Sequence, residues 1–386
     1  MLYRRLMLGT VLAVAMAAAT FAPTVFGVLA SDLISFLRIE RWQLGLLVSG
    51  ATLCGAVFSL LLGKWADMVG GRRATILTLL IAGVALVGVG AAPGFGVMMV
   101  AACLAGIASG LSNPATNRLI SEEFATGSQS LIVGVKQSGV QIGVFLGGWL
   151  LPVFTMWWDW RWAVVAFAAV PLVFAGLYTA TASRVHAGRE DTAGEPFSRI
   201  PRMIYRLAVY GFIMGTGMSV VLAYLPLYAE EVMGMSQGQA GLALAVTGLV
   251  GILARLGWAR VAEGRFGSVR SLRTIALLAV AMGLVLAFGH QLGSWTIWLA
   301  AALTGLSGSA WNAVGMLAII QILPTSLAGR GSGVVLLGFL TGLGLGAPVV
   351  GLSVDLLGVY TPGWLAITVL FGLGFWVMNT GRRRVG

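Results

Sequence analysis

A lysine and a glutamine lie next to each other inside a long apolar stretch of the chain. The stretch is LIVGVKQSGVQIGVFLGGWLLP, residues 131–152, and the two polar residues are Lys136 and Gln137. A charge at the centre of a membrane helix costs about 2.5–3.5 kcal/mol on insertion scales, so such residues commonly serve a function. Lys136 is therefore a candidate for binding an anion. The alternative is a lysine whose four-carbon stem carries its ammonium group to the membrane surface.

A second cation, Arg255, lies in the apolar stretch LVGILARLGWAR. The thirteen acidic residues fall in loops or near the ends of apolar stretches, with Asp32 and Asp355 nearest to the membrane. Two buried cations without a protein carboxylate would repel each other, so we expect an anionic substrate to balance them. Arginine offers a planar fork for a carboxylate or phosphate, and lysine a point charge. Asp32 is the candidate for a proton-coupling group.

Several uncharged polar residues also lie in apolar stretches and need hydrogen-bond partners there. Asn113 and Asn312 either line a polar cavity together with Gln137 or tie neighbouring helices to each other, and the sequence favours neither. Tyr224 and Tyr228 are predicted to belong to an aromatic belt at the membrane surface, with an outer gate as the alternative.

The composition indicates that lipid surrounds these stretches. Hydrophobic residues make up 58% of the chain and charged residues 10%, with a mean hydropathy of +0.94, whereas soluble domains carry about 25% charged residues. A spanning helix needs about 20 apolar residues, and the stretches lack the alternation of a membrane barrel. We predict an all-α membrane protein with twelve spanning helices, at residues 7–31, 43–63, 74–92, 96–117, 130–152, 162–182, 206–228, 239–259, 273–289, 295–322, 331–353 and 361–380.

The basic residues predict the orientation. With the N-terminus in the cytoplasm, nearly all of them fall in cytoplasmic segments, and only Arg38, Arg41 and Arg161 fall outside, as the positive-inside rule expects. Both termini of this multi-pass protein are then cytoplasmic, in a bacterial-type inner (plasma) membrane. The formal net charge of +11 reflects this bias and does not indicate nucleic-acid binding, because no basic stripe is interleaved with exposed aromatic residues.

The chain contains an internal repeat. An offset of 196 residues aligns Asp67 with Glu263 and Gly71 with Gly267, and an offset of 199 aligns Asn113 with Asn312 and residues 134, 139, 143 and 147 with 333, 338, 342 and 346, all of them glycine. The repeat predicts two pseudo-symmetric six-helix halves, 1–182 and 206–386, joined by a cytoplasmic linker, 183–205. Related halves that rock about a midplane site are typical of secondary transporters. The glycine stripe 139–147 also predicts close approach of another helix.

The stretch GKWADMVGGRR, residues 63–73, resembles the cytoplasmic loop motif between helices two and three of the major facilitator superfamily. The matching residues are Gly63, Asp67, Gly70, Arg72 and Arg73, while Met68 and Gly71 stand where basic residues are usual. The resemblance covers nearly the whole chain and implies that this loop stabilises the outward-facing state; the alternative is a plain positive-inside anchor. An aspartate here can lie at a helix N-terminus, and the arginines can bind nearby carbonyls or acids.

The resemblance also implies a substrate site. Helices five and eight are neighbours in this superfamily, which places Lys136 and Arg255 on opposite walls of one cavity, an arrangement similar to that of monocarboxylate and cyanate carriers. Gln137, Asn113 and Asn312 are further candidates. We therefore expect a monomeric transporter of a small organic anion, with proton symport as one option.

Two other function classes compete with the anion carrier. A drug exporter for lipophilic or cationic compounds is the first, although the chain reads GGWLLP where exporters often carry G-P-x-x-G-G. A sensor built on the transporter fold is the second, and it would normally carry an added soluble domain. No enzymatic activity, cofactor or metal site is expected. The chain lacks a Walker motif for ATP hydrolysis, and Cys54 and Cys103 are interpreted as packing residues. His186 and His290 have no other ligand residues at the spacing of a metal site.

Overall fold

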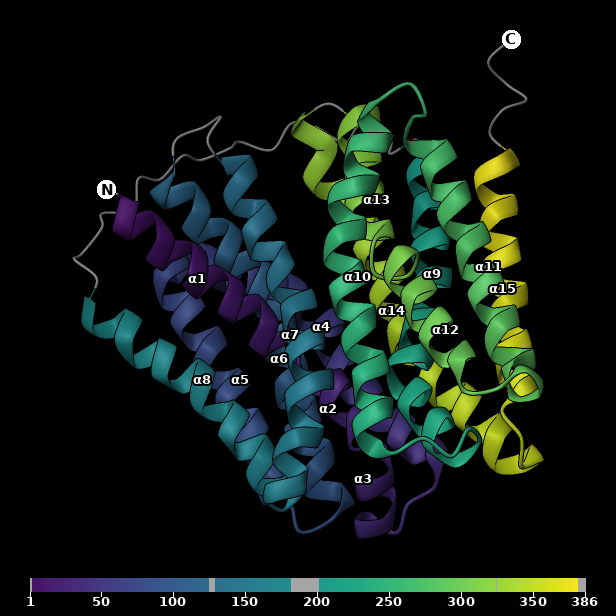
Figure 1. Ribbon diagram of the computed structural model, residues 1–386. Helices are drawn as coiled ribbons and strands as arrows, with labels where there is room; N and C mark the ends of the chain where they lie inside the picture. The colour runs from purple at the N-terminus through teal and green to yellow at the C-terminus, as the bar shows by residue number, and fades with distance from the viewer. Residues whose placement is uncertain (1, 125–128, 182–200, 324, 381–386) are drawn as a thin grey trace. The chain divides into compact units, whose positions relative to one another are not determined.

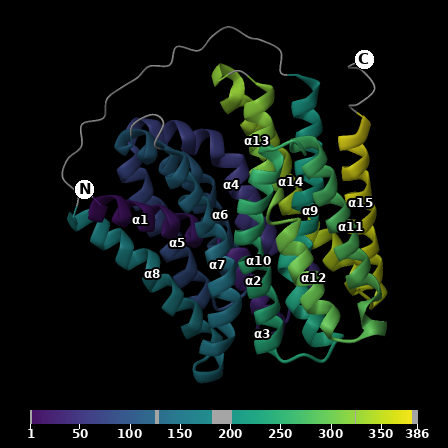
Figure 2. The same cartoon turned by 45° about the horizontal axis from the view of Figure 1, so that its top comes forward.

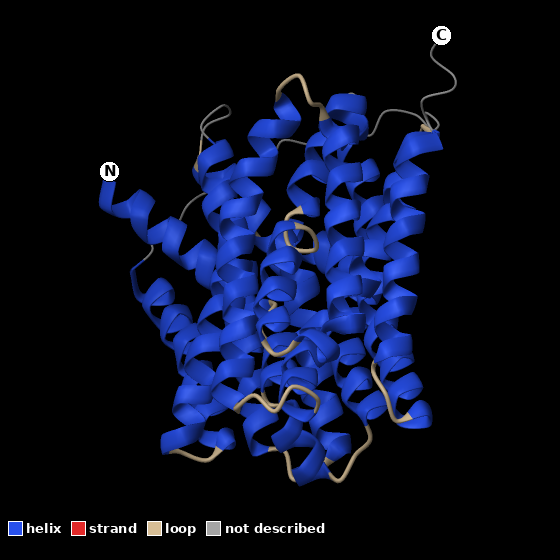
Figure 3. Ribbon diagram, turned by 45° about the vertical axis from the view of Figure 1, so that its right-hand side comes forward, coloured by secondary structure: helices blue, strands red, loops and turns tan. Residues whose placement is uncertain are grey.

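Long apolar runs form helices here because a helix satisfies its own backbone hydrogen bonds where water is scarce. The computed structural model describes residues 2–124, 129–181, 201–323 and 325–380, and every regular element within these ranges is a helix (Figures 1 and 3). Within these ranges, ten helices are long and apolar enough to span a membrane, and the number is twelve if each of two bent pairs counts as one span. The all-α membrane fold is therefore confirmed.

The chain divides into two units. The first comprises Met1–Ile39 and Leu46–Glu190, and the second comprises Glu40–Gly45 and Asp191–Gly386. The elements of the first half of the chain are α1 (Leu2–Ala19), α2 (Ala22–Val28), α3 (Ala30–Leu37), α4 (Arg41–Val69), α5 (Gly71–Ala91), α6 (Phe95–Glu123), α7 (Gln129–Trp157) and α8 (Trp160–Thr181). Those of the second half are α9 (Arg202–Glu231), α10 (Gln237–Glu263), α11 (Ser268–Leu292), α12 (Trp295–Leu306), α13 (Trp311–Ile322), α14 (Thr325–Leu357) and α15 (Thr361–Asn379).

Three predicted boundaries need correction. The predicted helix 7–31 is broken: α1 and α2 meet at an angle of 52°, and Pro23, at the start of α2, has no N–H to continue a helix. The predicted helix 295–322 is divided into α12 and α13 by residues 307–310. Helix α9 already begins at Arg202, so residues 202–205 are helical; most of the predicted linker 183–205 lies outside the described residues.

Glycine stripes bring helices into backbone contact in each unit. In the first unit α7 packs on α1, where a Cβ atom on Gly139 would overlap the carbonyl oxygen of Ala13. In the second unit α14 packs on α9 (Figure 2), and Gly342 lies in the same way against the carbonyl oxygen of Phe212. The predicted close approach at the stripe 139–147 is confirmed. Of the glycines aligned by the 199-residue offset, Gly139 and Gly143 pack on α1, and Gly338 and Gly342 pack on α9 in the same way, whereas Gly134 and Gly333 have no atom within 4 Å of an added Cβ.

A glycine turn precedes α5 and recurs before α11. Gly70 has φ 86° and ψ 153°, and Gly267 has φ 78° and ψ 156°, a conformation that side chains with a Cβ rarely adopt. The sequence alignment paired Gly71 with Gly267, whereas the backbone pairs Gly70 with Gly267. The repeat therefore shifts by one residue at this turn.

Candidate functional site

Lys136 lies in a polar seam between α6 and α7. Its side chain is fully buried, with 0% exposure, and its Nζ atom donates a hydrogen bond of 2.6 Å to Oδ1 of Asn117. Beside it, Nε2 of Gln137 donates to Oδ1 of Asn113 at 3.3 Å. The structure thus joins three predicted residues and adds Asn117, which the sequence analysis missed. The four-residue spacing of the asparagines, which places both on one face of α6, was the available signal.

The ammonium group of Lys136 gives this seam a positive charge. Among the described residues, its hydrogen-bond partner is the neutral Oδ1 atom of Asn117. Among the described residues, no carboxylate forms an ion pair with Lys136. One turn further along α7, Gln141 is 2% exposed, and its Oε1 atom has no hydrogen-bond partner within the described ranges. The full burial of Lys136 contradicts the alternative of an ammonium group carried to the surface. The seam can accept an anion that also brings a hydrogen-bond donor.

Arg255 supports a helix break in the second unit. Its Nε atom donates to the carbonyl oxygen of Ser309 at 2.8 Å, and Nε1 of Trp258 donates to that of Leu306 at 2.9 Å. Carbonyls at a helix end lack partners in their own helix, so these two α10 side chains satisfy groups freed between α12 and α13. The sequence did not predict this role, although the Ser-Gly-Ser run at 307–309 was a signal for a helix break.

Asn312 lies just past this break, in the first turn of α13. Its Oδ1 atom is buried and has no hydrogen-bond partner among the described residues. Lys136 and Arg255 belong to different units, so their convergence on one substrate, with Asn312 nearby, stays a prediction.

Glu122 occupies the N-terminus of α5, the helix that begins within the motif 63–73. Its carboxylate accepts the N–H of Gly71, the first residue of α5, at 3.1 and 3.3 Å, and Nε of Arg118 at 2.7 Å. Asp67 instead lies exposed in the last turn of α4 and makes no hydrogen bond with the described residues. Asp67 therefore does not lie at the N-terminus of α5, and its predicted role in stabilising one state of the transporter stays a prediction. A carboxylate at this N-terminus is favoured by the helix dipole.

The other motif residues differ in their contacts. Nη2 of Arg72 donates to the carbonyl oxygens of Tyr178 and Thr179, at 3.4 and 3.1 Å, in the last turn of α8. The expectation that an arginine of the motif binds nearby carbonyls is confirmed for Arg72. Arg73 is exposed, and Gly63 has space around it.

We predict that Glu122 contributes to the stability of the fold and that Asp67 does not. Glu122→Gln removes the charge that faces α5 and Arg118, so the free energy of unfolding is expected to fall by about 1–2 kcal/mol. Asp67→Asn is expected to change it by less than about 0.5 kcal/mol, while slowing transport with little loss of ligand affinity. Thermal unfolding of the two purified variants in detergent measures these changes in the free energy of unfolding. A larger loss in Asp67→Asn would contradict the assignment.

The structure also locates Asp32 and the two tyrosines of the predicted aromatic belt. Asp32 is in the first turn of α3 and is half-buried. Tyr224 and Tyr228 are 0% and 2% exposed, and their hydroxyl groups donate to backbone carbonyls, Tyr228 to that of Leu286 at 3.0 Å. The aromatic-belt interpretation of these tyrosines is therefore wrong, because a belt residue keeps its polar edge in contact with water.

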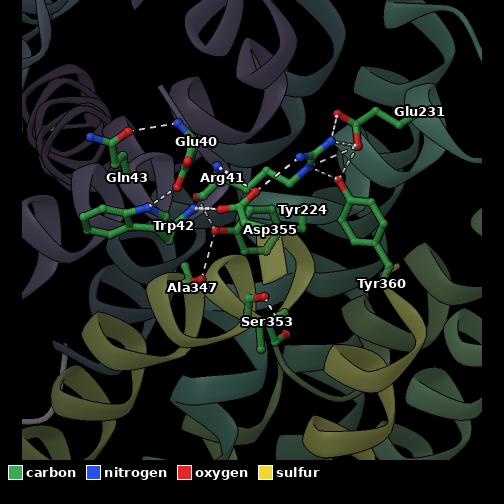
Figure 4. Close-up of polar contacts among 11 residues, drawn as sticks. Glu40, Arg41, Trp42, Gln43, Tyr224, Glu231, Ala347, Ser353, Asp355 and Tyr360 are labelled. Carbon is green, nitrogen blue, oxygen red and sulfur yellow. Dashed lines mark hydrogen bonds and ion pairs between the residues drawn. The ribbon is translucent and has the colours of Figure 1, made fainter. Parts of the chain in front are cut away.

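An ionic cluster that the sequence did not predict lies in the second unit (Figure 4). Nη2 of Arg41 donates to both carboxylate oxygens of Glu231 at 2.9 Å, and Nη1 donates to Asp355 at 3.2 Å. The hydroxyl group of Tyr360 donates to Glu231 at 2.6 Å, and burial together with this bond raises the pKa of Tyr360. We call these four residues the Arg41 cluster. It borders a cavity of about 810 Å³ that His290 also lines.

Within the described residues, no three His, Cys, Asp or Glu side chains are grouped so that they could hold a metal ion. Cys54 and Cys103 are free thiols. His186 lies outside the described residues.

The model of the Major Facilitator Superfamily matches residues 6–335, and the chain therefore belongs to this family of membrane transporters. The probable sulfoacetate transporter SauU of Cupriavidus necator is 25% identical over 367 residues, which are 86% of this chain and 83% of that protein. The multidrug resistance protein MdtG of Proteus mirabilis is 26% identical over 165 residues, 42% of this chain and 40% of that protein. The hexuronate transporter of Bacillus subtilis is 22% identical over 142 residues, 37% and 34% of the two chains. The matches thus span less than half the length of MdtG and of the hexuronate transporter.

Solved structures show the same fold. A bacterial homologue of the human lysosomal transporter Spinster, in an inward-facing and occupied conformation, has a TM-score of 0.80 at 17% identity, with 99% of this chain and 97% of that chain covered. A mutant of the nucleoside transporter NupG has a TM-score of 0.75 at 11% identity, with 97% and 99% covered. The relatives carry different substrate names, so family membership leaves the substrate class open.

Proposed function

We propose that this chain is a secondary transporter for a small organic anion that carries a carboxylate or sulfonate group. The observation that carries the proposal is Lys136, whose fully buried ammonium group meets, among the described residues, only the neutral Oδ1 atom of Asn117. A buried cation without a counter-charge is costly, and a bound anion offsets that cost. Two relatives are named for substrates of this kind, sulfoacetate and hexuronate.

The substrate would bind at the seam of α6 and α7. Lys136 supplies the positive charge, and Gln137 and Asn113 supply amide groups. The Oε1 atom of Gln141 would accept a hydrogen bond from a hydroxyl or N–H group of the substrate, since a buried carbonyl oxygen without a partner is unfavourable. Arg255 and Asn312 are proposed to contribute a second cation and a further amide from the second unit, and Asp32 is the proposed proton-coupling group. Similarity to monocarboxylate and cyanate carriers remains part of this proposal.

A drug exporter is the second candidate, and a specific feature favours it. The first unit contains an apolar cavity of about 590 Å³ between α1, α7 and α8, lined by Phe21, Phe154 and Phe167 among others. One relative is named a multidrug resistance protein. Lipophilic compounds would suit such a lining.

A thermal-shift screen of the purified protein separates the two candidates. The arms are carboxylates and sulfonates, inorganic anions, and lipophilic cations. A ligand at 100 times its Kd stabilises the folded state by about 2.7 kcal/mol, which is a clear rise in Tm. We expect this rise with organic anions; a rise with lipophilic cations alone would favour the exporter.

We also propose that the protein works as a monomer in the bacterial-type inner membrane, with both termini in the cytoplasm. The excess of basic residues in alternate loops supports this orientation. A fusion of alkaline phosphatase after Gly386 is expected to be inactive, because this reporter folds only outside the cytoplasm, and a fusion of green fluorescent protein there to be bright. The reverse pair of results would contradict the orientation.

A further inference from the structure

Three arginines line a cavity in the second unit. Helix α15 packs on both α9 and α11 (Figures 1 and 2), and a cavity of about 490 Å³ lies at the end of the unit where α9 and α11 begin. Its wall includes Arg206, on α9, and Arg270 and Arg273, on α11. No described residue in this wall is a carboxylate, and none of the three arginines forms an ion pair within the described ranges. The described part of the chain therefore leaves the positive charge of this cavity unbalanced.

These arginines direct few of their N–H groups to other parts of the protein. A guanidinium group has five N–H donors. Arg206 donates to Oγ1 of Thr380, at the end of α15, at 3.0 Å. The guanidinium group of Arg273 lies over the ring of Phe375, 5.0 Å from its centroid, and its buried Nε atom has no hydrogen-bond partner among the described residues. Arg270 is exposed. A buried donor without a partner is unfavourable, so an acceptor bound in the cavity would stabilise this arrangement.

The first unit has a carboxylate at the corresponding helix start. There, Glu122 accepts the N–H of Gly71, the first residue of α5. The 199-residue offset aligns Glu122 with Gln321, whose Oε1 atom accepts the hydroxyl group of Ser268, the first residue of α11, at 2.7 Å. A neutral amide thus stands where the first unit has an anion, although the N-terminus of either helix favours negative charge. An anion from outside the chain would supply that charge at α11.

The same cavity has an apolar wall. Met203, Phe266, Val269 and Met378 line it, and Phe266 and Val269 are 42% and 39% exposed. In the proposed orientation this end of the second unit is cytoplasmic, and anionic lipids lie in that leaflet. Basic pockets between spanning helices on this side bind acidic lipid head groups. Arginines beside apolar side chains match a phospholipid, in which a phosphate is joined to acyl chains, better than they match a free inorganic anion.

We propose that this cavity binds the phosphate group of an anionic phospholipid. Arg270 and Arg273 hold the phosphate oxygens, because the planar fork of arginine matches their geometry, and Arg206 adds positive charge. Phe266 and Val269 contact the first carbons of the acyl chains. The bound lipid then supplies the negative charge that the start of α11 lacks. This site lies apart from the substrate seam of α6 and α7, and the proposal does not depend on which substrate is transported.

Native mass spectrometry of the intact protein in detergent tests the site with phosphatidylglycerol, phosphatidylcholine and inorganic phosphate as separate probes. We expect phosphatidylglycerol to bind more tightly than phosphatidylcholine, which has no net charge. Arg270→Gln is expected to lower the affinity for phosphatidylglycerol by roughly fivefold. Arg265→Gln is the matched control, because Arg265 is exposed in the turn before α11 and lies outside the cavity wall; it should change the affinity by less than about twofold.

Equal affinities in the two variants would overturn the site, because the total charge of the protein would then explain the binding. Displacement of bound phosphatidylglycerol by inorganic phosphate at the same concentration would overturn the lipid assignment and indicate a site for free phosphate.

A second variant adds the carboxylate that the first unit carries. Gln321→Glu keeps the size of the side chain and places a negative charge beside Ser268, so we expect weaker binding of phosphatidylglycerol. Gln291→Glu is the control, since it is the same change at an exposed position in the last turn of α11. An unchanged affinity in Gln321→Glu, or an equal loss in both variants, would contradict the site. Neither measurement involves a transported substrate, so a negative result here leaves the proposed transport of an organic anion in place.

Discussion

Lys136→Gln is expected to weaken binding of an organic anion by roughly tenfold to a hundredfold. The substitution keeps a hydrogen-bonding side chain beside Asn117 and removes a full positive charge. Charge-assisted hydrogen bonds are worth about 1.5–3 kcal/mol, and each 1.4 kcal/mol is a factor of ten in affinity. The fold should persist, because the change removes a buried charge that no carboxylate in the described residues balances. Isothermal titration with an anion from the thermal-shift screen measures the effect.

Lys64→Gln is the matched control, since it is the same chemical change at an exposed position on α4. It should leave anion affinity within a factor of about two, as surface substitutions usually have small effects. Equal losses in both variants would show that the total charge of the protein, rather than the seam, attracts the anion. If Lys136→Gln leaves anion binding unchanged and improves transport of lipophilic cations, the exporter becomes the better interpretation.

Gly342→Ala is expected to lower the free energy of unfolding by about 3 kcal/mol. The added methyl group would overlap the carbonyl oxygen of Phe212, so α14 and α9 must move apart along a contact that Gly338 and Gly346 also make. Overpacking of this kind costs typically 1–3 kcal/mol and occasionally more, and here the obstructing atom is backbone. Thermal or denaturant unfolding of the purified variant in detergent gives the value.

Gly333→Ala lies on the same helix and should have the opposite sign. No atom lies within 4 Å of its added methyl group, and alanine favours a helix over glycine by up to about 1 kcal/mol. Gly143→Ala, in the first unit, should be intermediate, because its methyl group would approach Ala17 at 3.3–3.4 Å. Similar effects in all three variants would mean that helix propensity, rather than the close helix contact, controls stability at these positions.

The sequence predicted the helical spans because each one depends on a local property. An apolar run must satisfy its own backbone hydrogen bonds in lipid, so it forms a helix wherever it is long enough. The close helix contact at the glycine stripe 139–147 could also be predicted, since only small residues allow two membrane helices to touch along their backbones. Lys136 also stood out locally, as a charge within an apolar run.

The tertiary structure decided which residues meet, because partners distant in the chain leave no periodic signal. Glu122 rather than Asp67 faces the start of α5, since α6 folds back to that turn. Arg255 contacts the break after α12 across 54 residues of chain. The Arg41 cluster joins Arg41 to residues 190 to 319 positions further along the chain, and Asp355 accepts the backbone N–H groups of Arg41 and Trp42 at the start of α4. The sequence by itself determined a helical membrane protein with a buried cation, while packing determined which polar groups that cation and its neighbours contact, because hydrogen bonds act only over about 3 Å.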